Sequence, residues 1–395
     1  MPSPITRENW LDTPHNRWSF HHVGEVLDTV PIVSDGRRTI TLPRRHVDLD
    51  GVPLRSRDGS MTTWARHLDE SFCDAICVIH DGSIVYERYF NGLGSDSRHL
   101  LMSVTKSFTA AALGIAIGRG LLSTSTLVTN IAPEFAGTSL DGCTVRHVID
   151  MTAGTDFVED YDLYENPDDD VPLIEYERQA GFRPLGDREP VGVLRHFATY
   201  PLARPHGIVF DYRSPLTNIA ARIVEIVNDL PFDDVLSRDV WSAFGMEHAA
   251  EMSVDHHGFP IAEAGLCCSV RDLAKFGLAY LNDGVLDAQR VLPASWVDDT
   301  FRGDDDARTC YLRYLDSPAH SGVEGADWSM YHNAFWIRHA GAQMSGLGIF
   351  GQYVWIDRPS RTVIARFSSY PTAAPTEISA ESIRGFNAVA TALTA

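Results

Sequence analysis

Strand-forming and helix-forming patterns are segregated along this 395-residue chain, and this segregation constrains its fold more than any other feature. Two β-rich runs flank the Asp81-Gly82 pair within Asp74 to Phe90, which predicts a β-hairpin. Two further β-runs joined by the turn DRPSR are predicted between Gln343 and Tyr370. Helical patterns fill the segment between these regions. The order predicts an α/β (α+β) protein in which both ends of the chain build one domain and a mostly helical domain is inserted.

The predicted boundaries are residues 10–118 and 265–395 for the α/β domain and residues 119–264 for the mostly helical domain. Helices are expected where caps and apolar periodicity coincide, namely in the stretch ended by Gly118, in Thr144 to Gly154, in Ser214 to Asp229, in Ser269 to Gly284 and from about Thr376 onward. The segment from Arg302 to Ala326 is polar and acidic without visible periodicity, so we expect a long loop or a lid there.

The charge of the chain restricts its partners. It carries 53 Asp and Glu residues against 33 Lys and Arg residues, a formal net charge of −20. Nucleic acids and anionic membrane surfaces require clustered basic residues, so we expect neither as a partner. The N-terminus lacks the pattern of a signal peptide, and the longest apolar run is too short to span a bilayer. We therefore expect a cytoplasmic protein whose six scattered cysteines are reduced core residues rather than disulfide or metal ligands.

A Ser-x-x-Lys pattern is the first feature that carries chemistry. Only two lysines occur in the chain, Lys106 and Lys275, and Lys106 lies three residues after Ser103. On a helix these positions share one face, so the amine can reach the hydroxyl. Burial lowers the pKa of a lysine and allows it to act as a base, whereas an arginine stays protonated. Alone, the pattern is equally compatible with a helix-capping serine and a lysine that extends its amine to the surface.

The context of this pattern resembles a known family. RHLLMSVTKSFTAAALGIAI resembles the nucleophile helix of the β-lactamase/penicillin-binding-protein superfamily of serine hydrolases. TVRHVIDMTAG, FDYRSPLTNIAARIVE and SVRDLAKFGLAYL resemble further segments of that superfamily, in the same order. The resemblance implies a β-lactamase-like fold, with an antiparallel sheet flanked by helices and an active site in the cleft between the two domains. PHNRWSF, EDY, ERQAGFR and GLGIFGQYVWID resemble the branch of 6-aminohexanoate-dimer (nylon-oligomer) hydrolases.

The resemblance implies roles for three catalytic residues. Ser103 would be the acylated nucleophile, Lys106 its base, and Tyr212 the group that donates a proton to the leaving amine. The backbone N–H groups of Ser103 and Leu347 would form the oxyanion hole, with Gly346 keeping the backbone close. A core tyrosine with a satisfied hydroxyl is the alternative for Tyr212.

Three further residues are expected to bind substrate. Tyr161 matches a tyrosine that contacts the scissile amide in the nylon-oligomer branch, and a surface tyrosine is the alternative. Glu177 matches an acidic position facing the substrate amine, and Glu263 is an acid at a pocket position where this sequence departs from the branch. Two carboxylates could hold an ammonium group, although solvated surface acids remain the alternative in so acidic a chain.

These observations predict a serine amidohydrolase that cleaves small linear amides through an acyl-enzyme, with ester hydrolysis as a side activity. The lysine of the family's Lys-Thr-Gly motif is missing at Met344 to Leu347, which argues against β-lactamase and peptidase activity. A carboxylesterase, a β-lactam or D-amino-acid hydrolase, and a non-catalytic binding module remain as alternatives. We expect no metal and no organic cofactor. The nylon-oligomer branch tends to form homodimers, so the resemblance implies a homodimer, although nothing in the sequence shows an interface.

Overall fold

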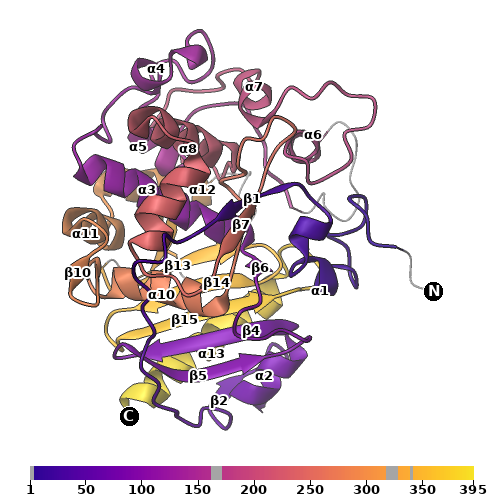
Figure 1. Ribbon diagram of the computed structural model, residues 1–395, viewed down its shortest axis with the longest axis vertical. Helices are drawn as coiled ribbons and strands as arrows, with labels where there is room; N and C mark the ends of the chain where they lie inside the picture. Colours follow the sequence, from indigo (N-terminus) through magenta and orange to yellow (C-terminus); the bar gives the residue numbers. More distant parts are fainter. Residues whose placement is uncertain (1–3, 162–170, 317–327, 339–340) are drawn as a thin grey trace.

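A computed structural model describes residues 4–161, 171–316, 328–338 and 341–395. Its central element is a seven-stranded sheet in which every neighbouring pair is antiparallel. The strands, in sheet order, are β11 (Met330–His332), β12 (Phe335–Arg338), β13 (Gln343–Gly348), β14 (Gln352–Asp357), β15 (Thr362–Ser368), β4 (Cys73–His80) and β5 (Ser83–Tyr89). Strand β15, from the C-terminal part of the chain, pairs with β4, from the N-terminal part, so both parts contribute to this sheet (Figure 1).

Helices cover both faces of this sheet (Figure 1). Alternate residues of a strand point to opposite faces, so Val354 faces α10 while Trp355 packs on Phe386 of α13. A Cβ added at Gly277 of α10 would lie 2.6 Å from Val363, so this glycine lets the helix approach the sheet closely. Buried side chains on both faces form one continuous core.

Helices and single turns occur along the whole chain. The helices are α1 (Asn16–Ser19), α2 (Trp64–Glu70), α3 (Thr105–Gly118), α4 (Val128–Ile131), α5 (Val145–Ile149), α6 (Pro172–Gln179), α7 (Val193–Ala198), α8 (Pro215–Asn228), α9 (Phe232–Leu236), α10 (Val270–Leu281), α11 (Ala294–Arg302), α12 (Asp305–Leu315) and α13 (Thr376–Thr394). Three 3₁₀ turns are η1 (Val23–Glu25), η2 (Met102–Val104) and η3 (Pro133–Phe135), and a π-helical segment η5 spans Ser237–Ser242.

A second, four-stranded antiparallel sheet lies beside the segment that leads into α3. Its strands, in order, are β1 (Thr29–Ile32), β7 (Ala250–Ser253), β8 (Leu266–Cys268) and β6 (His99–Leu100). Two further strand pairs are β2 (Pro53–Arg55) with β3 (Met61–Thr63) and β9 (Val285–Leu286) with β10 (Gln289–Arg290). Strand β7 therefore introduces β-structure into the segment 119–264 that we expected to be mostly helical.

Two sequence predictions are wrong in detail. The segment expected to be a loop from Arg302 contains the eleven-residue helix α12, which Asp304 caps by accepting a hydrogen bond from the Ala307 N–H. Its buried residues Ala307, Cys310, Tyr311 and Tyr314 follow helical spacing, which the surrounding acids conceal. Residues 317–327 of that prediction lie outside the described residues. The C-terminal β-region contains three strands rather than two, because a tight turn at Phe350 separates β13 from β14.

The helix expected from Thr144 to Gly154 begins as predicted but ends at Ile149. Several other expectations hold. The turn of the β4–β5 hairpin lies at Asp81 and Gly82, both of which have positive φ. Helices α8 and α10 lie within their expected ranges. All six cysteines are buried and free. Among the described residues, no helix is both long and apolar enough to cross a lipid bilayer.

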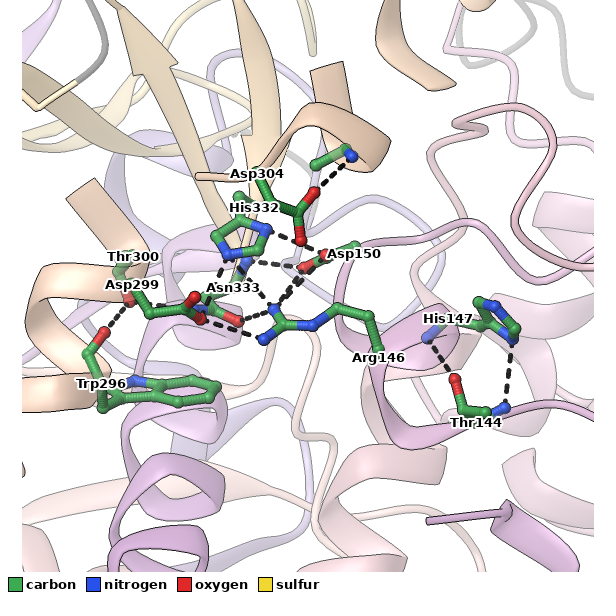
Figure 2. A network of polar contacts seen from close by, with 11 residues as sticks. Thr144, Arg146, His147, Asp150, Trp296, Asp299, Thr300, Asp304, His332 and Asn333 are labelled. Atoms are coloured by element: carbon green, nitrogen blue, oxygen red, sulfur yellow. Dashed lines mark hydrogen bonds and ion pairs between the residues drawn. The ribbon is translucent and has the colours of Figure 1, made fainter. Parts of the chain in front are cut away.

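A partly buried ion-pair network joins α5 to the β11–β12 hairpin and α11 (Figure 2). The His332 ring donates to Asp150 at 2.9 Å and to Asp299 at 3.2 Å, and Arg146 contacts Asp299 at 3.0 Å. Although burial opposes its charge, these carboxylates raise the pKa of His332 to about 9. Oxygens of Asp150 and Asp304 approach His332 closely enough to suggest a cation site. The Arg146 guanidinium already supplies positive charge there, so the cluster is an ion-pair network that fixes the hairpin.

Candidate active site

Ser103 and Lys106 come together at the start of α3. Ser103 lies in the 3₁₀ turn η2, and the Lys106 amine donates a hydrogen bond to Ser103 Oγ at 2.7 Å. The same amine donates to the backbone carbonyl of Glu263 at 2.9 Å. Lys106 is only 1 % exposed, so its amine is held by these two oxygen atoms rather than by water.

The backbone immediately before Ser103 adopts an uncommon conformation. Met102 has a φ of 46°, in the left-handed region that a side chain disfavours, and it is buried. Such conformations cost about 1–3 kcal/mol and concentrate at functional sites. The turn orients Ser103 toward Lys106.

Burial sets the electrostatics of Lys106. Removal from water lowers the pKa of its amine to about 8, while the carboxylates of Glu159 and Glu263 oppose the shift. A lysine with such a pKa is partly neutral near pH 8 and can accept a proton.

Tyr212 completes the cluster from the segment before α8. Its ring centroid lies 5.2 Å from Lys106 Nζ, and its phenol interacts with Ser103. Burial raises the pKa of the Tyr212 phenol, with Glu159 contributing to the same direction, so the phenol stays protonated. The ring stacks on Trp336 of β12, which fixes its plane.

Strand β13 lies beside the turn that carries Ser103. A Cβ at Gly346 would approach Ser107 Oγ and Val354 within 2.9 Å, and one at Gly348 would lie 2.6 Å from the Leu101 carbonyl oxygen. Both glycines therefore permit the close approach that we expected of Gly346. Leu347 stands between them on β13. Its expected oxyanion-hole role stays a prediction.

A pocket opens next to Ser103. Its walls are partly apolar and partly acidic, formed by Met102, Ser103, Glu159, Tyr161, Leu173, Tyr176, Glu177, Ala180, Phe182, Ser214, Glu263, Ala264 and Ile349. The three residues expected to bind substrate, Tyr161, Glu177 and Glu263, all line it. Gly346 and Leu347 are not among the lining residues.

Glu159 has the most extensive contacts of the pocket acids, and the sequence analysis gave it no role of its own. Its carboxylate accepts hydrogen bonds from the backbone N–H of Ser214 at 2.5 Å and from Ser214 Oγ at 2.7 Å. It also accepts a hydrogen bond from the Tyr161 hydroxyl. Glu159 therefore ties the loop that carries Tyr161 to the segment that carries Tyr212. In the sequence, the one sign of this contact was Ser214, which stands two residues after Tyr212.

Glu177 and Glu263 differ in their partners. Glu177 forms an ion pair with Arg183 Nε. This ion pair neutralises the Glu177 carboxylate, which we had expected to face a substrate amine. Glu263 is buried, and within the described part of the chain its Oε2 has no hydrogen-bond partner. Burial raises the pKa of the Glu263 carboxyl, and the nearby Lys106 opposes this shift.

A serine and a buried lysine at the start of a helix, beside an antiparallel sheet of this topology, are the arrangement of the β-lactamase-like serine hydrolases. Residues 62–384 match the Beta-lactamase family model, and the chain belongs to this family. The 6-aminohexanoate-dimer hydrolase of Paenarthrobacter ureafaciens is 33% identical over 369 residues, which cover 93% of this chain and 88% of that protein.

Solved structures agree with the fold. A Bacillus anthracis protein, provisionally named a 6-aminohexanoate-dimer hydrolase, superposes with a TM-score of 0.88 at 27% identity, covering 100% of this chain and 99% of that one. EstCE1, described as a hydrolase with promiscuous acyltransferase activity, superposes with a TM-score of 0.61 at 16% identity, covering 82% and 96%, and is similar in fold alone.

Proposed function

We propose that this protein hydrolyses small linear amides through an acyl-enzyme on Ser103, with ester hydrolysis as an accompanying activity. The observation that carries the proposal is the 2.7 Å hydrogen bond between the buried Lys106 amine and Ser103 Oγ. The similarity to a 6-aminohexanoate-dimer hydrolase supports an amide bond between flexible aliphatic units as the target.

In the proposed acylation, neutral Lys106 removes the proton of Ser103 as Oγ attacks the substrate carbonyl carbon. The backbone N–H groups of Ser103 and Leu347 stabilise the oxyanion that forms. When the carbon–nitrogen bond breaks, Tyr212 gives its proton to the leaving nitrogen and recovers one from protonated Lys106. The amine product leaves, and the acyl group stays on Ser103.

In the proposed deacylation, water replaces the departed amine. Lys106, neutral again after the relay, accepts a proton from the water as its oxygen attacks the acyl carbon. The ester bond to Ser103 breaks, Oγ regains a proton, and a carboxylic acid leaves. Net consumption is one amide and one water, so the cycle needs no redox partner.

The deciding experiment compares wild type with Ser103→Ala on 6-aminohexanoate dimer, a p-nitrophenyl ester and nitrocefin. We expect turnover of the dimer and the ester by wild type, and a loss of at least about 10³-fold in the variant. Equal turnover by Ser103→Ala would contradict the proposal. Ester turnover with a background rate on the dimer would favour the carboxylesterase alternative instead.

The non-catalytic alternative predicts that Lys106 lies out of reach of Ser103. The Lys106 amine lies 2.7 Å from Ser103 Oγ, which gives no support to a binding module. The β-lactam alternative lacks support from the strand beside the site, where Met344 stands in place of the family's lysine.

A further inference from the structure

We propose that Asp150 is a positioning residue for Tyr212. Its carboxylate holds the tip of the β11–β12 hairpin, and two aromatic side chains of that hairpin, Tyr331 and Trp336, keep the Tyr212 ring in the orientation that proton transfer requires. The inference rests on the proposed function and deepens it, since it assigns control of amide cleavage to a residue that touches neither the substrate nor the reacting atoms. Asp150 lies in TVRHVIDMTAG, a segment from which the proposed function draws no residue.

The tip of the hairpin is a tight turn in an unfavourable conformation. Asn333 and Ala334 connect β11 to β12 with φ values of 47° and 60°, and both are buried. A two-residue turn with two positive φ angles fits the twist of the strands, but it favours Asn followed by Gly. At Ala334 the left-handed conformation costs about 1–2 kcal/mol. Contacts from neighbouring elements must therefore hold this turn.

Asp150 supplies two of these contacts (Figure 2). Its Oδ1 accepts a hydrogen bond from the Asn333 backbone N–H at 2.9 Å, and its Oδ2 accepts one from the His332 ring at 2.9 Å. Arg146 lies 3.4 Å from the same Oδ2 and donates to the Asn333 side-chain oxygen at 2.7 Å. Both oxygens of one carboxylate thus bind consecutive residues at the start of the turn.

The hairpin presents an aromatic platform to Tyr212. Tyr331 and Trp336 lie directly opposite each other in the register of β11 and β12 and therefore share one face of the sheet. The Tyr212 ring stacks on Trp336, with 5.7 Å between centroids and 16° between planes. It meets the Tyr331 ring edge-on at 5.8 Å. A shift of the hairpin tip moves both rings that orient Tyr212.

The end of α5 also holds the backbone on either side of Tyr212. Met151, the residue after Asp150, accepts a hydrogen bond from the Asp211 N–H at 3.0 Å through its carbonyl oxygen. Its Sδ accepts one from the Arg213 N–H at 3.4 Å. Asp150 and Met151 therefore join the backbone that carries Tyr212 to the hairpin that orients its ring.

Helix α3 gives the hairpin a fixed position relative to the nucleophile. Ser107 Oγ donates a hydrogen bond to the Ala334 carbonyl at 2.9 Å, and Ser107 directly follows Lys106. A tip held in this place fixes Tyr212 with respect to Ser103 and Lys106. A misplacement of reacting groups by about 1 Å can cost about 10²-fold in rate.

The test is the ratio of kcat on 6-aminohexanoate dimer to kcat on p-nitrophenyl heptanoate, measured in one preparation. This ratio does not depend on the fraction of folded protein, and only the leaving amine needs a proton from Tyr212. Asp150→Asn keeps the size of the side chain but removes its charge and one acceptor. We expect it to lower the ratio at least about tenfold. An unchanged ratio would overturn the inference.

Asn333→Gly tests the same link if Asp150→Asn does not fold. Glycine accepts the positive φ of the turn and removes the side-chain contacts of the tip with Arg146, Asp299 and Thr300. The ratio should fall in this variant too. A ratio equal to that of wild type would then be the overturning result.

A double-mutant cycle shows whether Asp150 acts through Tyr212. In a Tyr212→Phe background there is no phenol to orient, so adding Asp150→Asn should change the ratio by at most about twofold. Losses that multiply would show that Asp150 acts by another route and would overturn the inference. A purely structural role would instead lower turnover of both substrates equally.

Asp239→Asn is the matched control. Asp239 of η5 is as buried as Asp150 and pairs with Arg119 at 2.6 Å, but neither residue belongs to the hairpin or to the segment of Tyr212. We expect lower stability and an unchanged ratio. If Asp239→Asn lowered the ratio as Asp150→Asn does, the loss would be a general response to a broken ion pair, and the inference would fail.

Ser103→Ala separates this inference from the proposed function. If wild type does not cleave the dimer, or if Ser103→Ala still cleaves it, the proposed function fails and the inference fails with it. If wild type cleaves the dimer, Ser103→Ala does not, and Asp150→Asn keeps the wild-type ratio, then the proposed function stands and this inference alone is wrong.

Discussion

The two lysines of this chain lie in two regions that bury an amine in opposite ways. Lys275 of α10 lies 3.4 Å from a carboxylate oxygen of Glu247 and 3.6 Å from one of Asp272, and it donates a hydrogen bond to the Gly245 carbonyl. Lys106 of α3 contacts a serine hydroxyl and a backbone carbonyl, and no ion pair to it occurs among the described residues.

This difference separates a structural cation from a base. Carboxylates in direct contact hold a buried ammonium in its charged form, and breaking such a pair is strongly destabilising. Neutral oxygen partners and burial instead favour the uncharged amine, which can accept a proton. We therefore expect the same side chain, equally buried, to support folding in one region and chemistry in the other.

Lys106→Met should produce the largest effect, on activity. Without the base, we expect kcat/KM on the p-nitrophenyl ester to fall by about 10³- to 10⁴-fold. Thermal unfolding followed by circular dichroism should change little, because methionine fills a similar volume without a buried amine. A variant that unfolds far below wild type would mean that Lys106 is structural, and the contrast with Lys275 would disappear.

Lys275→Met should have the next largest effect, and on stability rather than on chemistry. Removal of the amine leaves Asp272 and Glu247 without their buried cation, which should lower the free energy of unfolding by about 3–5 kcal/mol. Urea denaturation measures this change. At a temperature where the variant remains folded, we expect kcat/KM within about threefold of wild type, and a loss comparable to that of Lys106→Met would contradict the comparison.

Tyr212→Phe should sharpen the comparison by separating amide from ester turnover. A leaving amine needs a proton, whereas p-nitrophenolate leaves without one. We expect kcat on 6-aminohexanoate dimer to fall by about 10²- to 10³-fold and kcat on the p-nitrophenyl ester to fall by at most about tenfold. Equal losses on both substrates would assign Tyr212 to Ser103 activation instead of proton donation.

The pH profile of kcat/KM on an uncharged ester, p-nitrophenyl heptanoate, should carry the signature of Lys106. The neutral amine is the active form, so the rate should fall about tenfold per unit as the pH drops below about 8, and it should level off above that value. The folded-state pKa of Lys106 lies below the unfolded value of 10.5, so the unfolded chain binds more protons between these values. Stability should therefore rise with pH from about 8 to 10.5 through this group, and Lys106→Met should lack the rise.

His332→Gln should give the smallest effect, with the opposite sign in pH. Asp150 and Asp299 raise the pKa of His332 above its unfolded value of 6.5 to about 9. The stability that this ring contributes is therefore complete below about pH 6.5 and is lost as the pH rises through 9. The difference in unfolding free energy between wild type and His332→Gln, measured in urea at several pH values, should shrink over this range. A constant difference would mean that the ring is neutral in the folded protein.

The sequence predicted well where local patterns decide the structure. The caps at Thr144 and Ser269 start α5 and α10 as expected, and the Asp81-Gly82 pair forms the hairpin turn. Helix α12 escaped prediction because acidic residues hide its buried stripe, although Asp304 is a recognisable cap. The polar and acidic composition of that segment led us to expect a loop, although its buried residues follow helical spacing.

The candidate site was less predictable, because distant segments determine it. The Ser103 and Lys106 pair follows from helical spacing alone. The pairing of Glu177 with Arg183 depends on the chain that follows α6, and the pairing of Glu159 with Ser214 joins residues 55 positions apart. No local pattern reveals which of three pocket acids keeps an unsatisfied oxygen.

The burial of both lysines also has a practical consequence for protein chemistry. Lys106 and Lys275 are 1 % and 0 % exposed, so amine-directed acylating reagents meet no lysine on the folded protein. Labelling of either side chain requires that its region open first. Peptide mapping by mass spectrometry after timed exposure to an N-hydroxysuccinimide ester would then report the opening of α3 and of α10 separately, in a single unmodified chain.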